Sequence, residues 1–166
     1  MNSALQGGFL YLVEVVDKTG NVVDSEEIHN LVPIEGLNHF LNVVLKGSAQ
    51  AAAWYVGLFE GNYTPTTNDV MATFAAASTE NITYTGGVRK TLTLGTVATG
   101  AVDNTANKAE FPFPGNKTIY GGFISSSSAQ GGTSGTLLSA VRFSSPKAVA
   151  ADFTLRITAG FTIASL

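Results

Sequence analysis

The sequence predicts a mainly β protein, a β-sandwich or jelly-roll of about seven to eight strands with one amphipathic helix. Three observations favour this fold. Apolar and polar residues alternate along several short segments, turn residues recur at a spacing of roughly 8 to 12 residues, and one segment has a clear helical period. The 166 residues are one domain's worth of chain. We therefore expect an N-terminal arm, residues 1–8, and a single β-sandwich domain, residues 9–166.

The last strand is the clearest. From Asp152 to Ile163 the odd-numbered residues are apolar and the even-numbered residues are polar or small, which indicates one buried face and one polar face. The segment 89–94 alternates as well, with Lys90, Leu92 and Leu94 on one side and Arg89, Thr91 and Thr93 on the other. The other predicted strands are 9–17, 22–24, 54–60, 109–113, 118–125 and 136–144.

The segment from Pro33 to Lys46 predicts a helix, with Gly47 at its C-terminal end. Apolar residues recur at i, i+3, i+4, i+7 and i+8: Leu37, Phe40, Leu41, Val44 and Leu45. This stripe is expected to pack on the sheet. Gly36 weakens the first turn, since glycine costs roughly 1 kcal/mol relative to alanine inside a helix, so the helix is expected to begin a residue or two later.

A second, shorter helix of one or two turns is predicted between Asp69 and Ala77. Its inward residues would be Val70, Met71 and Phe74. Asn68 or Asp69 would serve as the N-cap, because both side chains can accept a hydrogen bond from the first turn.

The composition excludes several classes of protein. Charged residues are 13% of the chain against about 25% on average, and the net charge of −3 leaves no basic stripe for nucleic acid. There is no Cys, hence no disulfide and no thiolate site. The longest uncharged run, Thr118 to Val141, is too polar to span a membrane, and Met1 to Val13 lacks the basic residues of a secretory signal.

Residues for catalysis or metal binding are sparse. His29 and His39 are isolated and are expected at the surface or its boundary, and the residues around Ser134 do not form a G-x-S-x-G nucleophile elbow. We expect no enzyme, no cofactor and no metal site. A carboxylate pair for glycoside hydrolysis stays open, because the fold could bring together any two of four acids, although surface acids are the favoured interpretation. These acids are Glu14, Glu60, Glu80 and Glu110.

Three segments, taken in order, resemble small virion proteins of tailed bacteriophages of the capsid decoration (cement) type. They are NLVPIEGLNHFLNVVLKG (Asn30 to Gly47), AWYVGLFEGNYTPTTNDVMATFA (Ala53 to Ala75) and YGGFISSSSAQGGTSGTLLSAVRFSSPKAV (Tyr120 to Val149). Together they cover 71 of 166 residues. The order of the segments carries the resemblance, because each alone could occur in many β proteins.

The resemblance implies a structural protein of the capsid surface, made in the host cytoplasm, that stabilises the capsid by bridging subunits of the major capsid protein. It also implies no catalytic residue. A homo-oligomer is expected as well, because so few charges leave a broad neutral surface. The alternative is a tail- or fibre-associated module that binds a receptor or glycan. The expected partner contacts lie in two segments, Met1 to Gly8 and Ser126 to Gly135, because neither has the apolar period that would fix it to the core. The expected contact residues are Leu5, Gln6, Gln130, Thr133 and Ser134.

Overall fold

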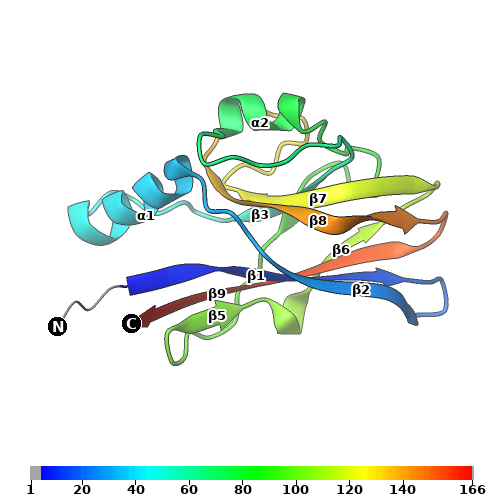
Figure 1. Ribbon diagram of the computed structural model, residues 1–166, viewed down its shortest axis with the longest axis horizontal. Coiled ribbons are helices and arrows are strands. Elements are labelled where there is room, and N and C mark those ends of the chain that lie inside the picture. Colours follow the sequence, from blue (N-terminus) through cyan, green and yellow to red (C-terminus); the bar gives the residue numbers. More distant parts are fainter. Residues whose placement is uncertain (1–4, 166) are drawn as a thin grey trace.

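The computed structural model describes residues 5–165 and confirms a mainly β fold of two antiparallel sheets packed as a β-sandwich (Figure 1). Sheet A has the strand order β2-β1-β9-β5, with β6 also paired to β9. Its strands are β1 (Leu5–Val16), β2 (Val22–His29), β5 (Ala101–Asp103), β6 (Ala109–Pro112) and β9 (Thr154–Ser165). Sheet B has the order β4-β3-β7-β8. Its strands are β3 (Tyr55–Phe59), β4 (Lys90–Thr91), β7 (Lys117–Ser125) and β8 (Leu137–Val149).

The main core lies between the two sheets. It receives alternate residues of β1 and β9 from sheet A, which meet apolar residues of β3, β7 and β8 from sheet B. A second, smaller core lies between sheet B and the helix α2 (Met71–Ala77), around Phe59, Phe74 and Phe123. Sheet B is therefore covered on both faces, which explains why β3 is apolar on both sides.

The face assigned to the last strand is confirmed. Leu155, Ile157 and Ala159 of β9 are fully buried, and Ile157 lies opposite Val13 of β1 in the antiparallel register. One position differs from the prediction. Thr158 should be on the polar face but is only 8% exposed, and its hydroxyl has no hydrogen-bond partner among the described residues. The polar face of β9 is therefore partly covered.

Several predicted strand boundaries are wrong. Within residues 5–165 there are nine strands rather than seven or eight, because the three-residue β5 is too short to show an alternation. β2 and β8 extend further than predicted, and Leu5 to Gly8 are a part of β1 paired with β9 rather than an arm. The segment 89–94 shrinks to Lys90–Thr91, and Arg89 is buried. The jelly-roll alternative stays a prediction.

The short second helix is confirmed, but its cap is not. Met71 and Phe74 are buried as predicted. The N-cap is Val70, which makes no side-chain hydrogen bond, while Asp69 accepts hydrogen bonds from the Thr66 amide at 2.8 Å and the Tyr63 hydroxyl at 2.7 Å. The Asp69 side chain thus stabilises the loop before the helix instead of capping it.

The main helix, α1 (Ile34–Lys46), has the predicted extent. Gly47 ends it in the left-handed conformation with φ 67°, which glycine adopts without strain. The helix begins at Ile34, one residue after Pro33 as expected, and its first turn includes Gly36. This glycine is kept in the first turn because a Cβ there would lie 2.6 Å from the Leu138 carbonyl oxygen. Its absence of a side chain lets the helix approach β8 closely.

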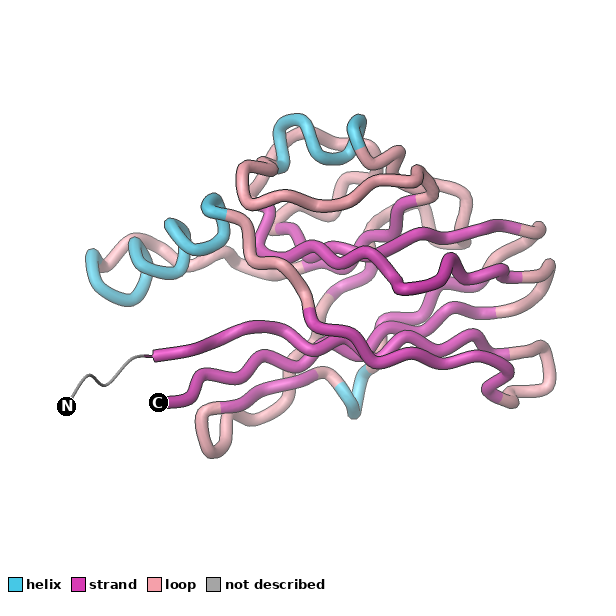
Figure 2. The backbone as a smooth tube through the Cα atoms, in the orientation of Figure 1, coloured by secondary structure: helices cyan, strands magenta, loops and turns pink. Residues whose placement is uncertain are grey.

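The packing predicted for α1 is wrong. The helix projects from one end of the sandwich, beside the ends of β1 and β9, instead of lying along a sheet (Figures 1 and 2). Its only buried residue is Gly36. The inner faces of the two sheets already cover each other, and α2 covers the outer face of sheet B, so neither of these faces is left for the apolar stripe of α1.

Candidate interaction surface

The first turn of α1 is fixed to the sandwich by its backbone and by one carboxylate. Glu35 Oε2 accepts hydrogen bonds from the Met71 amide at 2.9 Å and the Leu137 amide at 2.6 Å. The Ile34 amide donates to the Thr67 carbonyl oxygen at 2.9 Å. One side chain therefore links α1 to both α2 and β8, and the direction in which the helix leaves the domain is set at its base.

Beyond the first turn, α1 contacts the domain through few side chains. The ring of His39 meets the ring of Trp54 edge to face, with centroids 5.2 Å apart. The ring of Phe40 lies 6.4 Å from that of Phe161 in β9, which in turn stacks against Phe9. The side of α1 that faces the domain thus carries Gly36 and His39, and the apolar stripe is turned about two fifths of the way round the helix from that side.

The apolar stripe is consequently open to solvent. Exposed fractions run from 38% at Phe40 to 74% at Leu45, although these are residue types that normally lie inside a protein. We name these residues the α1 surface. It consists of Ile34, Leu37, Phe40, Leu41, Val44 and Leu45. Large apolar side chains gathered in this way on a soluble domain mark a site of interaction.

The sequence-based contact residues fall elsewhere. Gln6 is exposed and belongs to β1 of sheet A, whereas Gln130, Thr133 and Ser134 lie in the loop that joins β7 to β8 of sheet B. The two groups therefore come from different sheets. Leu5 is in β1, but its side chain is outside what the structure describes, as are residues 1–4 of the proposed contact segment.

The loop 126–135 is held by a buried ion pair rather than by apolar packing. Arg89 donates to the carbonyl oxygens of Ser127 and Gly132, both at 3.0 Å, and Glu80 Oε2 accepts from the Gly131 amide at 2.9 Å. The loop does lack an apolar period, as predicted, but polar contacts hold its first part to the domain. Thr133 and Ser134, which follow these anchors, are exposed and available for contact.

The four acids considered for hydrolysis each pair with a different cation. Glu14 pairs with Lys108, Glu60 with Lys117, Glu80 with Arg89 and Glu110 with Arg156, at distances of 2.6 to 3.0 Å. Glu80 is not the surface acid that was expected, because it is only 8% exposed. Each of these carboxylates is thus part of an ion pair within the domain.

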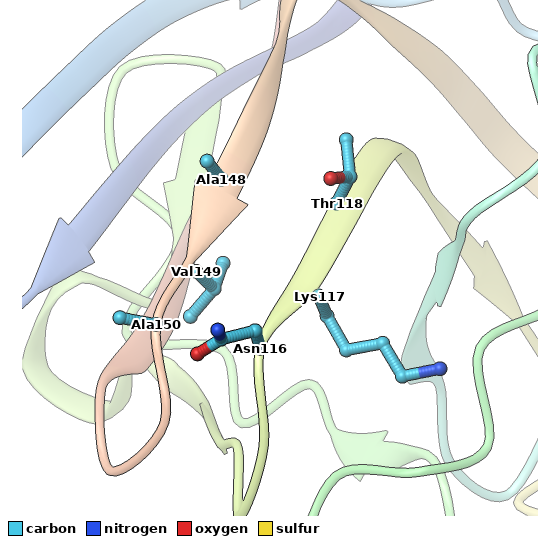
Figure 3. Close-up of a pocket in the computed structure, with 6 residues that line it drawn as sticks. All are labelled: Asn116, Lys117, Thr118, Ala148, Val149 and Ala150. Atoms are coloured by element: carbon cyan, nitrogen blue, oxygen red, sulfur yellow. The ribbon is translucent and has the colours of Figure 1, made fainter.

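One hollow, with a volume of about 420 Å³, lies where β7 begins and β8 ends (Figure 3). Asn116, Lys117 and Thr118 line one side, and Ala148 to Ala150 the other. The Lys117 side chain extends away from β8, and its amine binds Glu60 at 3.0 Å. Asn116 Oδ1 accepts from the Ala151 amide. The side chains of Asn116 and Lys117 are thus engaged with the protein itself.

His29 borders a second, smaller hollow of about 200 Å³, and His39 contacts Trp54. In residues 5–165 no three His, Asp or Glu side chains come together as metal ligands would. Over the same residues, no helix has the length and apolar character needed to cross a bilayer.

No protein-family model matches the chain, and no curated protein matches it. The function is therefore argued from the α1 surface. Sequence reasoning found five of the six residues of this surface, all but Ile34, as an apolar helical stripe. It assigned them to the core, since a period of 3.6 is the same for a helix that covers a sheet and for one that binds another molecule. The sequence does not show that the inner faces of the two sheets cover each other and that α2 covers the outer face of sheet B, so the exposure of α1 could not be predicted from it.

Proposed function

We propose that this chain is a structural protein of a tailed-phage particle, of the capsid decoration type, which acts by binding and carries out no reaction. The observation that supports it is the α1 surface, six exposed apolar side chains on a helix that is fixed at its base and contacts the domain through few side chains beyond it. Such a surface is typical of a protein that acts by binding other subunits, either a second copy of itself or a neighbour in a larger assembly. The resemblance of three segments, in the same order, to capsid decoration proteins is the reason for proposing the phage capsid as that assembly.

The physical effect would be a shift in the assembly equilibrium. A protein that binds the assembled shell, and not its free subunits, stabilises the shell in proportion to the logarithm of its own concentration over its dissociation constant. No chemical step is needed. The low charge of the chain suits this role, because apolar and neutral surfaces lose little hydration energy on contact.

The direct test is the location and copy number of the chain in purified particles of the phage that encodes it. The proposal expects many copies on the capsid, measured by quantitative mass spectrometry of intact particles and of separated tails. A few copies confined to the tails would overturn it and would favour the receptor- or glycan-binding alternative.

A second test uses binding. Purified chain is sedimented with capsids from which it has been removed. The proposal expects saturable binding, and it expects capsids with bound chain to lose their contents at a higher temperature than bare capsids. Capsids that bind no chain, or that open at the same temperature with and without it, would contradict the decoration role.

A further inference from the structure

The α1 surface is too exposed for a helix that stands on its own. An isolated helix shorter than about 12 to 15 residues is marginally stable in water, and most helices in proteins gain their stability by burying an apolar face. α1 has 13 residues and buries only Gly36. A molecule that covers the stripe would therefore add stability to the helix.

We propose that this molecule is a second copy of the chain, and that two copies pair through their α1 surfaces about a two-fold axis. This proposal deepens the proposed function, because it assigns one surface to self-association and leaves others for the capsid. The argument rests on the extent of the surface, on its charge and on the neighbouring strand edge.

The extent of the surface fits a dimer. Six apolar side chains that are 38 to 74% exposed amount to several hundred Å², close to the roughly 800 Å² that each partner contributes to a standard interface. In a two-fold pair each copy contributes the same patch, so one apolar stripe supplies both sides. Residues at i, i+3, i+4 and i+7 are also the positions through which two helices interdigitate.

The charge of the surface permits two identical copies to meet. The charged residues of α1 are Glu35 and Lys46 at its two ends, and the Glu35 carboxylate is turned toward the Met71 and Leu137 amides. No charge lies within the stripe itself. Two copies would therefore bring no like charges together, which is the usual obstacle to self-association of a surface patch.

A free strand edge lies at the same end of the molecule. The Phe9 amide and carbonyl bind Asn30, and the β1–β2 pairing begins at Leu10. Gly7 lies two residues before Phe9, so its backbone amide and carbonyl point to the same edge of β1 as those of Phe9. At Gly7 no strand among residues 5–165 pairs with this edge, because β2 pairs only from Leu10 onward and β9 pairs with the opposite edge. An antiparallel edge can pair with its own copy across a two-fold axis, so the edge extends the surface that suits a second copy.

The test compares the oligomeric state of the full chain and of two variants by light scattering coupled to gel filtration, from about 1 to 100 μM. The wild-type chain is expected to be a dimer or a higher assembly built from dimers. Val44→Glu places a charge in the stripe and is expected to weaken association at least tenfold. The control, Val97→Glu, alters a side chain that is 71% exposed in the loop before β5, and it should leave association unchanged.

Cross-linking locates the contact. The chain has no Cys, so single cysteines can be introduced at Leu37, Leu41 and Val44, with Val97→Cys as the control. At least one α1 position should form a disulfide-linked dimer under mild oxidation much faster than the control. Circular dichroism of each variant checks that it is folded.

Three outcomes overturn the proposal: a wild-type chain that is monomeric at 100 μM, an oligomer that Val44→Glu leaves intact, or α1 cysteines that cross-link no faster than the control. The capsid-binding experiment is scored separately. A monomer that binds capsids through α1 would refute the second copy and leave the proposed function standing. A dimer that pairs through α1 but binds no capsid would support the second copy and contradict the proposed function.

Discussion

Arg89 and Glu80 form a two-pronged ion pair inside the domain, with Nε to Oε1 at 2.8 Å and Nη2 to Oε2 at 2.7 Å. Their side chains are 0% and 1% exposed. The remaining donors of Arg89 bind Ser125 Oγ and the carbonyl oxygens of loop 126–135, and the guanidinium also lies over the Phe123 ring. The pair thus joins the segment after α2 to the loop between β7 and β8.

Removing one partner of this pair should be strongly destabilising. Glu80→Gln leaves the buried guanidinium without its counter-charge, and we expect a loss of about 3 to 5 kcal/mol in the free energy of unfolding, measured by urea titration. The matched control is Glu110→Gln. Glu110 binds Arg156 at 2.8 Å, but its side chain is 54% exposed, so a change of about 0 to 1 kcal/mol is expected. Similar losses in the two variants would contradict the role assigned to burial.

The buried ion pair shows where sequence reasoning ends. Alternation along 89–94 placed Arg89 beside two threonines on one face of a strand, and the residues themselves do not show that Glu80 lies within hydrogen-bond distance of the guanidinium. In contrast, the buried face of β9 follows from its own period of two, and the extent of α1 follows from its period of 3.6 together with Gly47. Local patterns predict elements; the partners of each element depend on contacts distant in sequence.

The same distinction applies to the candidate site. Five of the six residues of the α1 surface were predicted as one apolar face, and Ile34 was not. The exposure of this face could not be predicted, because it depends on how completely the two sheets and α2 cover one another. Gly36 was the available signal. A glycine in the first turn of an otherwise regular helix indicates a close approach to backbone at that point, and here it is the contact from which the rest of the helix projects.

Gly36→Ala should destabilise the protein, contrary to helix propensity. In a free helix this change would be favourable by roughly 1 kcal/mol. At this position the new Cβ would lie 2.6 Å from the Leu138 carbonyl oxygen and 3.0 Å from that of Leu137, so α1 must shift away from β8. We expect a net loss of about 1 to 3 kcal/mol in the free energy of unfolding. Asn42→Ala, at an exposed position of the same helix, should be neutral or slightly stabilising.

The two faces of β9 should respond differently to a charge. Ile157 is fully buried, so Ile157→Asp should prevent folding, observed as loss of soluble, protease-resistant protein. Thr162 lies on the other face and is exposed, so Thr162→Asp should cost less than about 1 kcal/mol. Ile157→Val, which should fold, gives a measurable loss of about 0.5 to 1.5 kcal/mol. Equal behaviour of the two Asp variants would refute the register with β1.

Thr158 belongs with the buried residues in this series. Its even number suggested a tolerant position, but it is only 8% exposed and its hydroxyl lacks a partner among the described residues. Thr158→Asp is therefore expected to be severe. Thr158→Val keeps the shape and removes the unpartnered hydroxyl, so it should be neutral or stabilising in the same urea titration. A destabilised Val variant would indicate that the hydroxyl does have a partner.

The last prediction concerns acid stability and the link between β2 and β8. Lys147 of β8 is only 5% exposed and binds Glu26 at 3.0 Å and Asp24 at 3.2 Å. The Ser144 amide also donates to Glu26 Oε1 at 2.6 Å. Burial by itself raises the pKa of Glu26, but the hydrogen bond from Ser144 and the positive charge of Lys147 outweigh it, and the pKa lies below its ordinary value of 4.5.

Because the folded protein lowers this pKa, the unfolded chain binds the proton more readily and stability rises with pH in this range. The contribution of Glu26 is complete above about pH 4.5 and is lost as the pH falls through the lowered value. Glu26→Gln should therefore be less stable than wild type at pH 6, and the difference should narrow as the pH falls to about 3. Thermal unfolding at a series of pH values measures this difference in stability.

The control is Glu27→Gln, at the neighbouring exposed residue, which makes no ion pair within residues 5–165. If both variants follow the wild-type pH dependence with a constant offset, the Glu26 to Lys147 contact does not hold β2 against β8.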